Sequence, residues 1–209
     1  MKTGQEYLLI AEDDPDILKL LDATLTFKGY RVITAHNGRE ALEILQIKRP
    51  AIVIADIMMP KLDGFGLVHR IRINPETRDI PVVFITATYI TPADLEFALN
   101  IGATRFLQKP VDLEKLLVTI AELFEKGNPN VIKPLQEFEF YNEYRRRLEA
   151  KLEERNKQIA SEEHLLATDA DHGDSSILVS LHHAIRERDE LILLLEQIRE
   201  QLEKYSGAE

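Results

Sequence analysis

The sequence predicts an α/β domain with a doubly wound, five-stranded parallel sheet, followed by an all-α helical hairpin. Short β-branched runs alternate with longer helical patterns through the first two thirds of the chain. One run, residues 51–55, is apolar throughout, as is typical of a strand buried on both faces. Beyond residue 134 strand-like runs disappear, and apolar residues recur every three or four positions, which predicts the hairpin.

Five runs rich in β-branched and apolar residues have the length of strands. They cover residues 7–11, 31–35, 51–55, 81–85 and 104–107. The helices that fill the intervals are expected to begin near Pro15, Arg39, Phe65, Ala93 and Asp112. Because this alternation is typical of parallel strands joined by crossover helices, we expect helices on both faces of the sheet.

A cluster of helix-breaking residues predicts a linker over residues 127–134. The linker separates a first domain, residues 1–126, from a helical region, residues 135–209. That helical region contains 10 Lys and Arg residues and 18 Asp and Glu residues, a net charge of −8, whereas the whole chain has −10. Most of the acidity therefore belongs to the helical region.

The helical region shows two helical patterns on either side of a turn-rich stretch, residues 168–175. Apolar residues follow an alternating three-four spacing, which Arg145 and Arg155 interrupt in the first helix and Arg188 in the second. This spacing is typical of a helical hairpin or coiled coil. Since two helices alone bury little apolar surface, we expect the stripe to pair with a second copy, as a homodimer, or with a helical protein partner.

Composition excludes several classes of function. The chain has no cysteine, so disulfides, thiolate metal sites and cysteine nucleophiles are excluded. The first six residues are polar and the apolar runs are short, which predicts a cytoplasmic protein without a secretory signal or membrane insertion. The net charge of −10 disfavours nucleic-acid binding, which normally requires a basic patch.

Polar side chains follow four of the predicted strands. Glu12-Asp13-Asp14 follow the first strand, Asp56 the third, Thr86 the fourth and Lys109 the fifth. Ligands of such sheets bind at the carboxyl ends of the strands, so we expect these side chains to meet there. A few carboxylates suit Mg²⁺, a hydroxyl and an ammonium can hold phosphoryl oxygens, and a carboxylate can itself form an acyl phosphate. No phosphate-cradling GxxxxGK[ST] loop is present, so binding of a whole nucleotide is not indicated.

Four short motifs, in this order and spacing, resemble the receiver domain of two-component response regulators. They are Leu9-Ile10-Ala11-Glu12-Asp13-Asp14-Pro15, Ile54 to Gly64 (IADIMMPKLDG), Phe84-Ile85-Thr86-Ala87 and Gly102 to Pro110 (GATRFLQKP). The resemblance covers residues 1 to about 126 and says nothing about the helical region. It implies a flavodoxin-like receiver fold with the strand order 2-1-3-4-5.

The resemblance also implies roles for individual residues. Asp56 matches the aspartate that takes a phosphoryl group from the phosphohistidine of a histidine kinase or phosphotransfer protein. Asp13 and Asp14 match the acidic pair that holds Mg²⁺, with Asp56 and the backbone carbonyl of Met58 as further ligands. Lys109 matches the lysine that pairs with the phosphoryl oxygens.

Thr86 matches the hydroxyl that moves toward the phosphate, and Phe106 matches the aromatic switch residue that is often tyrosine in relatives. The Lys109–Pro110 bond is expected to be cis. Met58 and Thr88 match positions that influence the lifetime of the phosphate. The resemblance implies no enzymatic activity beyond self-phosphorylation and self-dephosphorylation, and we expect the helical tail to transmit the change.

Alternatives remain open at several positions. Asp13 and Asp14 could cap the helix that begins at Pro15. The tail could be a phosphotransfer module in a phosphorelay, with His182 or His183 as the acceptor, although exposed helix histidines are the ordinary interpretation. Residues 169–174 resemble a calcium loop but lack its closing glutamate. DNA binding by the acidic tail is a third, less favoured hypothesis.

Overall fold

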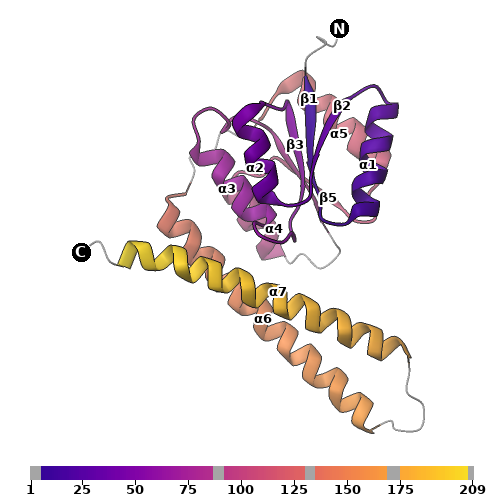
Figure 1. Ribbon diagram of the computed structural model, residues 1–209, viewed down its shortest axis with the longest axis vertical. Coiled ribbons are helices and arrows are strands. Elements are labelled where there is room, and N and C mark those ends of the chain that lie inside the picture. Colours follow the sequence, from indigo (N-terminus) through magenta and orange to yellow (C-terminus); the bar gives the residue numbers. More distant parts are fainter. Residues whose placement is uncertain (1–5, 87–91, 130–134, 169–174, 207–209) are drawn as a thin grey trace. The chain divides into compact units, whose positions relative to one another are not determined.

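Five parallel strands form one sheet in the order β2-β1-β3-β4-β5, as the sequence predicts (Figure 1). The strands are β1 (Tyr7–Ala11), β2 (Arg31–Ala35), β3 (Ile52–Asp56), β4 (Val82–Thr86) and β5 (Arg105–Gln108). The computed structural model describes residues 6–86, 92–129, 135–168 and 175–206. The chain divides into two compact units, Met1–Leu135 and Gln136–Glu209, and the sheet belongs to the first.

Helices cover both faces of the sheet (Figure 1). Two of them, α1 (Pro15–Phe27) and α5 (Leu113–Lys126), lie on one face and pack on alternate residues of the central strands. The other face carries α2 (Gly38–Ile47), α3 (Gly64–Ile73) and α4 (Pro92–Asn100). The two helical layers explain why every residue of β3 and β4 is buried.

The strand register brings the polar residues of the predicted site to one edge. Ala11 of β1 pairs with Ala55 of β3, so Glu12 and Asp56 follow at the same level. Thr86, the last residue of β4, pairs with Gln108 of β5. Because all five strands are parallel, the residues that end β1, β3, β4 and β5 meet at the carboxyl edge of the sheet.

A buried arginine joins α3 to two loops on the opposite edge. Arg72 is 2% exposed, and its guanidinium donates from Nε (2.9 Å) and Nη2 (2.7 Å) to the Gly102 carbonyl. Its Nη1 donates to the carbonyls of Arg78 (3.0 Å) and Ile80 (2.8 Å). Burial lowers the pKa of Arg72 to about 10, so the side chain remains a cation at neutral pH. One charged group thus satisfies three backbone carbonyls.

The second unit consists of two helices, α6 (Glu137–Thr168) and α7 (Ser175–Ser206), which pack together as an antiparallel hairpin. Each contact between the helices pairs a residue further along α7 with one correspondingly further back along α6, as antiparallel helices require. The contacts that set this register are Ser180 Oγ to Glu162 Oε1 (2.7 Å), Arg155 Nε to Glu187 Oε2 (3.2 Å), and the Tyr205 hydroxyl to the Glu137 carboxylate. The all-α character that the sequence predicts for this region is confirmed.

The three-four spacing of apolar residues in α7 predicts its buried face in part, because Tyr205, which follows the spacing, is 38% exposed and Leu194, which does not, is buried. Ala184, Leu191, Leu195 and Ile198 are all buried, whereas Arg188, which interrupts the spacing, pairs with its neighbour Asp189. Three sequence features fall outside the described residues: Thr88, most of the expected linker (130–134) and the calcium-like stretch 169–174. Within the parts of the chain that the structure describes, no helix is both long and apolar enough to cross a bilayer.

Candidate functional site

Four parts of the chain contribute side chains to the carboxyl edge of the sheet. Glu12 and Asp13 follow β1, Asp56 ends β3, Thr86 ends β4, and Lys109 follows β5. Glu12, Asp56 and Thr86 are buried, whereas Asp13 is exposed. The structure therefore brings together residues that are far apart in the sequence, with one side of the group open to solvent.

Lys109 links the two buried carboxylates. Its Nζ lies 2.9 Å from Glu12 Oε2 and 3.0 Å from Asp56 Oδ2. The other oxygen of Asp56, Oδ1, accepts a hydrogen bond of 2.8 Å from the backbone N–H of Ile57. The Asp56 carboxylate is thus fixed from both sides by a cation and a backbone donor.

Glu12, Asp13 and Asp56 form an acidic cluster. One carboxylate oxygen from each residue lies within 4.8 Å of the other two. Burial, followed by the charge of Asp56, raises the pKa of Glu12 to about 7, although Lys109 opposes this. Burial also raises the pKa of Asp56, and desolvation by the surrounding protein raises the pKa of Asp13, although that side chain is exposed on one side. One ammonium therefore does not fully compensate the three carboxylates.

Lys109 itself responds to these charges. Burial lowers its pKa, but the charges of Asp56 and Glu12 and their hydrogen bonds outweigh burial, so the net shift is upward. The ammonium form is therefore held firmly at neutral pH. A permanent cation beside Asp56 can pair with an incoming anion such as a phosphoryl group.

Asp14 does not join the cluster. Its Oδ1 accepts hydrogen bonds from the N–H groups of Asp16 (2.9 Å) and Ile17 (3.1 Å), which makes it the N-cap of α1. These backbone donors lower the pKa of Asp14. The resemblance implies that Asp13 and Asp14 lie together beside Asp56. In the structure Glu12 and Asp13 lie there instead. Asp14 caps α1, which is the alternative role that the sequence offers for it.

Thr86 ends β4, and Phe106 lies on β5, the strand that Lys109 directly follows. The Lys109 N–H donates to the Thr86 carbonyl (2.6 Å), which continues the ladder between β4 and β5. The Phe106 ring is half-buried, with its centroid 5.4 Å from that of Phe84 and the two planes tilted by 48°. The Lys109–Pro110 bond is cis, as expected from the sequence.

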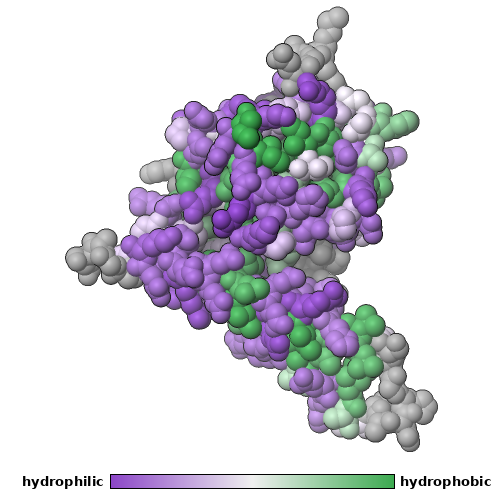
Figure 2. Space-filling view, in the orientation of Figure 1, coloured by the Kyte–Doolittle hydropathy of each residue, from purple (hydrophilic) through white to green (hydrophobic). Residues whose placement is uncertain are grey.

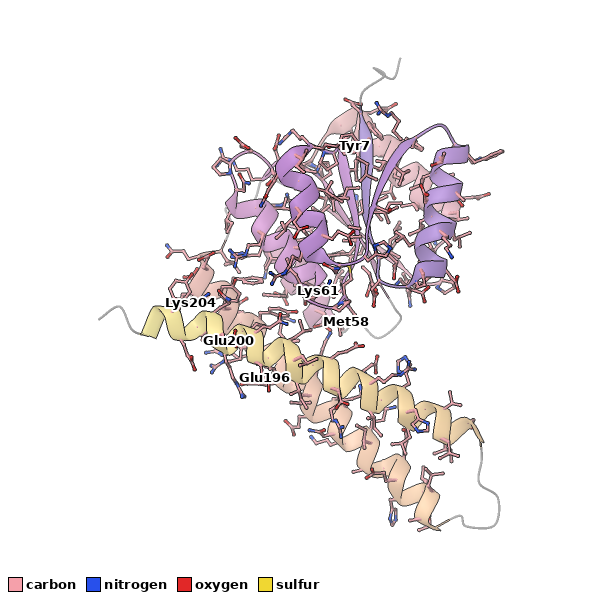
Figure 3. The ribbon with its side chains drawn as sticks, viewed as in Figure 1. Tyr7, Met58, Lys61, Glu196, Glu200 and Lys204 are labelled. Atoms are coloured by element: carbon pink, nitrogen blue, oxygen red, sulfur yellow. The ribbon has the colours of Figure 1, made fainter. Side chains whose placement is uncertain are left out.

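The loop after β3 is held close to Asp56. Met58 and Lys61 lie in this loop, at the carboxyl edge of the sheet (Figure 3). Lys61 has a positive φ of 67°, and the Gly64 N–H donates to the Ile57 carbonyl (2.8 Å), which closes the loop. Asp63 then caps α3 by accepting a hydrogen bond from the Gly66 N–H (2.8 Å). The loop that follows Asp56 is thus closed by backbone hydrogen bonds.

The donor set fits a hard divalent cation. Mg²⁺ prefers oxygen ligands, is held by few carboxylates and keeps several waters. Glu12, Asp13 and Asp56 offer carboxylate oxygens within reach of one another, and Asp13 lies on the solvent-exposed side. The excess negative charge in the cluster gives such an ion a favourable potential.

Glu12 should make the metal-free protein less stable as the pH rises. A carboxyl whose pKa is higher in the folded state than in the unfolded state binds more protons when folded, so the free energy of unfolding falls between the two pKa values. For Glu12, beside Asp56 and Lys109, this range runs from 4.5 to about 7. In a metal chelator, urea titrations of wild type should show this fall, and Glu12→Gln should flatten it. An equally steep fall in the variant would contradict the assignment.

The histidines considered for phosphotransfer belong to the second unit. His182 and His183 are both exposed on α7, and His183 Nδ1 lies 3.4 Å from Glu187 Oε2. Arg155 contacts the same carboxylate. Nothing in this arrangement distinguishes the histidines from ordinary surface residues of a helix.

The first unit is similar to known proteins in sequence and in structure. A family model described as "Response regulator receiver domain" matches residues 8–121. "Probable transcriptional regulator ycf27" of Porphyra purpurea is 35% identical over 128 residues, which are 61% of this chain and 51% of that protein. The structure of the chemotaxis response regulator CheY4 of Vibrio cholerae is 32% identical, with a TM-score of 0.53 over 56% of this chain and 98% of CheY4.

A further solved structure is the signal receiver domain of a signal transduction histidine kinase from Syntrophus aciditrophicus. It is 32% identical, with a TM-score of 0.55, and covers 60% of this chain and 94% of that domain. The chain spans about half the length of the first curated relatives that it matches. Because the family model ends at residue 121, the match concerns the first unit and leaves the role of α6 and α7 open.

Proposed function

Because the chain belongs to the response regulator receiver family, we propose that it accepts a phosphoryl group on Asp56 from the phosphohistidine of a histidine kinase or phosphotransfer protein. The observation that supports this proposal most directly is the set of charged groups around the Asp56 carboxylate. Its Oδ2 lies 3.0 Å from Lys109 Nζ, and it shares an acidic cluster with Glu12 and Asp13. A carboxylate fixed beside a cation and a metal-binding set can act as a nucleophile toward phosphorus.

The proposed reaction is an in-line displacement. A carboxylate oxygen of Asp56 attacks the phosphorus, the P–N bond of the donor breaks, and the imidazole leaves with the electron pair of that bond. The product is an acyl phosphate on Asp56. Lys109 supports the step because its ammonium, already 3.0 Å from Asp56, can neutralise the phosphoryl oxygens.

We propose Glu12, Asp13, Asp56 and the backbone carbonyl of Met58 as the Mg²⁺ ligands. The carboxylate distances support the first three, and Asp14 is omitted because it caps α1. A bound Mg²⁺ would neutralise charge on the carboxylates and on the transferred group. The chain itself supplies the nucleophile and the second cation, Lys109.

Mg²⁺ should stabilise the protein, and two neighbouring aspartates should differ in this effect. Binding to the folded state alone adds about 2.7 kcal/mol when the ion is at 100 times its dissociation constant. Asp13→Asn should weaken or abolish the rise in melting temperature with Mg²⁺, because it removes a ligand charge. Asp14→Asn should retain the rise, because asparagine caps a helix about as well as aspartate. Loss of the rise in Asp14→Asn alone would restore Asp14 as the ligand.

We propose Thr86 and Phe106 as the residues that respond to phosphorylation. The acyl phosphate adds oxygen acceptors at the end of β3, beside the Thr86 that ends the neighbouring strand β4. A shift of the Thr86 hydroxyl toward these oxygens would free volume beside β5, the strand next to β4. Phe106 lies two residues before Gln108, the strand partner of Thr86, and its ring packs against Phe84. We therefore propose that the position of the Phe106 ring follows the movement of Thr86.

The proposal is tested by treating the full chain with acetyl phosphate and Mg²⁺. Intact mass spectrometry should show one added phosphoryl group, which hydroxylamine removes because the product is an acyl phosphate. Omission of Mg²⁺ with a chelator present should suppress the modification. A modification that hydroxylamine does not remove, or one that still forms when Asp56 is replaced, would contradict the proposal. Acid-labile, base-stable label on His182 or His183 would instead support a phosphorelay.

The helical hairpin is proposed as the output region, which associates with a second copy or a helical protein partner. It carries apolar side chains that its own two helices leave exposed, as the hydrophobic patches along it show (Figure 2). On α7 these are Leu178, Val179, Ile192 and Leu193, which are between 37% and 66% exposed. Exposed apolar side chains on a helical hairpin are typical of an interaction surface.

Light scattering on the full chain tests the role of the hairpin. The mass measured with and without acetyl phosphate should differ if phosphorylation controls self-association. An unchanged mass and unchanged binding of partner proteins would contradict the proposal. A gel shift with DNA at modest salt would instead favour transcriptional control, which the net charge of −8 in this region disfavours.

A further inference from the structure

The chain that leaves α5 is tied back to the sheet. Gly127 ends α5 with a positive φ of 68°, and its N–H donates to the Leu123 carbonyl (2.9 Å). A Cβ at Gly127 would meet nothing within 4 Å, so the backbone conformation is the reason for glycine here. The next residue, Asn128, accepts a hydrogen bond of 3.2 Å at Oδ1 from the Thr104 hydroxyl.

Thr104 joins Asn128 to two strands. It is 1% exposed and directly precedes β5. Its Oγ1 accepts a hydrogen bond from the Val82 N–H (3.0 Å), and its own N–H donates to the Val82 carbonyl (2.8 Å). Val82 is the first residue of β4, so one buried hydroxyl connects the beginning of β4, the beginning of β5 and the second residue after α5.

The same two strands carry the candidate site at their other ends. β4 ends at Thr86, whose carbonyl accepts the Lys109 N–H at 2.6 Å, just after β5. β4 and β5 are therefore bonded to each other at both ends, through Val82 and Thr104 at one end and through Thr86 and Lys109 at the other. Because both strands are short and regular, a shift of β5 along β4 at the site must be taken up at Thr104.

We propose that Asn128 is a positioning residue that couples the β4–β5 pair to the segment leading to the helical hairpin. This inference rests on the proposed phosphorylation of Asp56. The connection runs from Thr86 and Lys109, along the two strands, through the Thr104 hydroxyl to Asn128. It is an internal route from the site to the end of the first unit, and it involves no exposed surface of α4 or α5.

Hydrogen–deuterium exchange of the full chain tests the coupling. In wild type, acetyl phosphate with Mg²⁺ should change the exchange of the first turns of α6 several-fold. Asn128→Ala should lose most of this change while Asp56 is phosphorylated to the same extent. Asn128→Asp keeps an acceptor oxygen for Thr104 and should retain the change. Asn100→Ala, an exposed asparagine at the end of α4, is the matched control and should behave as wild type.

Two results would overturn the coupling. One is an unchanged response of α6 in Asn128→Ala at full phosphorylation; the other is no response in phosphorylated wild type. A chain in which Asp56 takes no phosphoryl group contradicts the proposed function instead. In that case the connection can still be tested on the unphosphorylated protein. Asn128→Ala removes the acceptor of the Thr104 hydroxyl, so the hydrogen bond from the Val82 N–H to Thr104 should weaken and the Val82 amide should exchange faster. An unchanged exchange rate at Val82 would refute the connection.

Discussion

Replacement of Arg72 by methionine is expected to lower the free energy of unfolding of the first unit by about 3 kcal/mol. Methionine fills a similar volume and removes the buried charge, but it leaves the carbonyls of Gly102, Arg78 and Ile80 without the donor that they share. Each buried carbonyl without a partner costs about 1–3 kcal/mol. Native-state hydrogen exchange of the β4 amides measures this loss.

Two variants control for the charge and for the substitution. Arg39 is exposed on α2, so Arg39→Met should change the free energy of unfolding by less than about 0.5 kcal/mol. Arg72→Lys keeps the charge, but a single ammonium cannot replace the planar guanidinium that donates in two directions, so we expect an intermediate loss. If Arg72→Met proves as stable as Arg39→Met, Arg72 does not hold the loops together.

Gly64→Ala is expected to destabilise the first unit by about 3 kcal/mol and to impair phosphorylation of Asp56. A Cβ at this position would lie 2.4 Å from the Asp56 carbonyl oxygen, 2.8 Å from Ile57 Cα and 2.8 Å from the Phe84 ring. Two of these three atoms belong to the backbone that positions the Asp56 carboxylate, so they cannot move without moving the site. Chemical unfolding and acetyl phosphate labelling measure the two effects.

Gly29→Ala separates steric conflict from backbone strain. Gly29 has a φ of 84°, but a Cβ there would meet nothing within 4 Å, so only the conformational cost of about 1–2 kcal/mol applies. Phosphorylation should be unaffected in that variant. Equal losses of stability in the two variants, or normal labelling of Gly64→Ala, would show that the loop after β3 tolerates the extra carbon.

The sequence predicts the architecture well because the sheet has strong local signals. Residues 51–55 are apolar throughout, and the structure has a strand at Ile52–Asp56 that is buried along its whole length. Asp112 marks the beginning of α5 because aspartate is a favoured N-cap, and Gly127 marks its end because glycine readily adopts positive φ. These are properties of single residues and their neighbours, so no tertiary information is needed to find them.

The composition of the acidic cluster could not be predicted with the same certainty. Three acidic residues stand in a row after β1, and only the direction of the chain as it enters α1 decides which of them face Asp56. Asp14 lies one residue before Pro15, where its carboxylate is used as a cap, so the cluster takes Glu12 instead. The capping preference of aspartate before a proline was the available signal.

Arg72 escaped prediction for a different reason. A charged residue in a helix normally lies on the surface. The carbonyl partners of Arg72 come from the loop just after α3, at Arg78 and Ile80, and from Gly102, which is 30 residues away in the sequence. Gly102 has a positive φ of 105°, and a Cβ added to it would lie only 2.6 Å from Arg72 Nε, so the two residues are closely fitted. Only the folded structure reveals this pairing.

The most direct measurement of the central claim compares wild type with Asp56→Asn in the presence of radiolabelled acetyl phosphate and Mg²⁺. Asp22→Asn, a substitution at a partly exposed aspartate in the middle of α1, is the matched control. We predict that wild type and the control take up label that hydroxylamine removes, and that Asp56→Asn takes up none. Label in Asp56→Asn at the wild-type level, with the protein folded, would contradict the assignment of Asp56 as the phosphoryl acceptor.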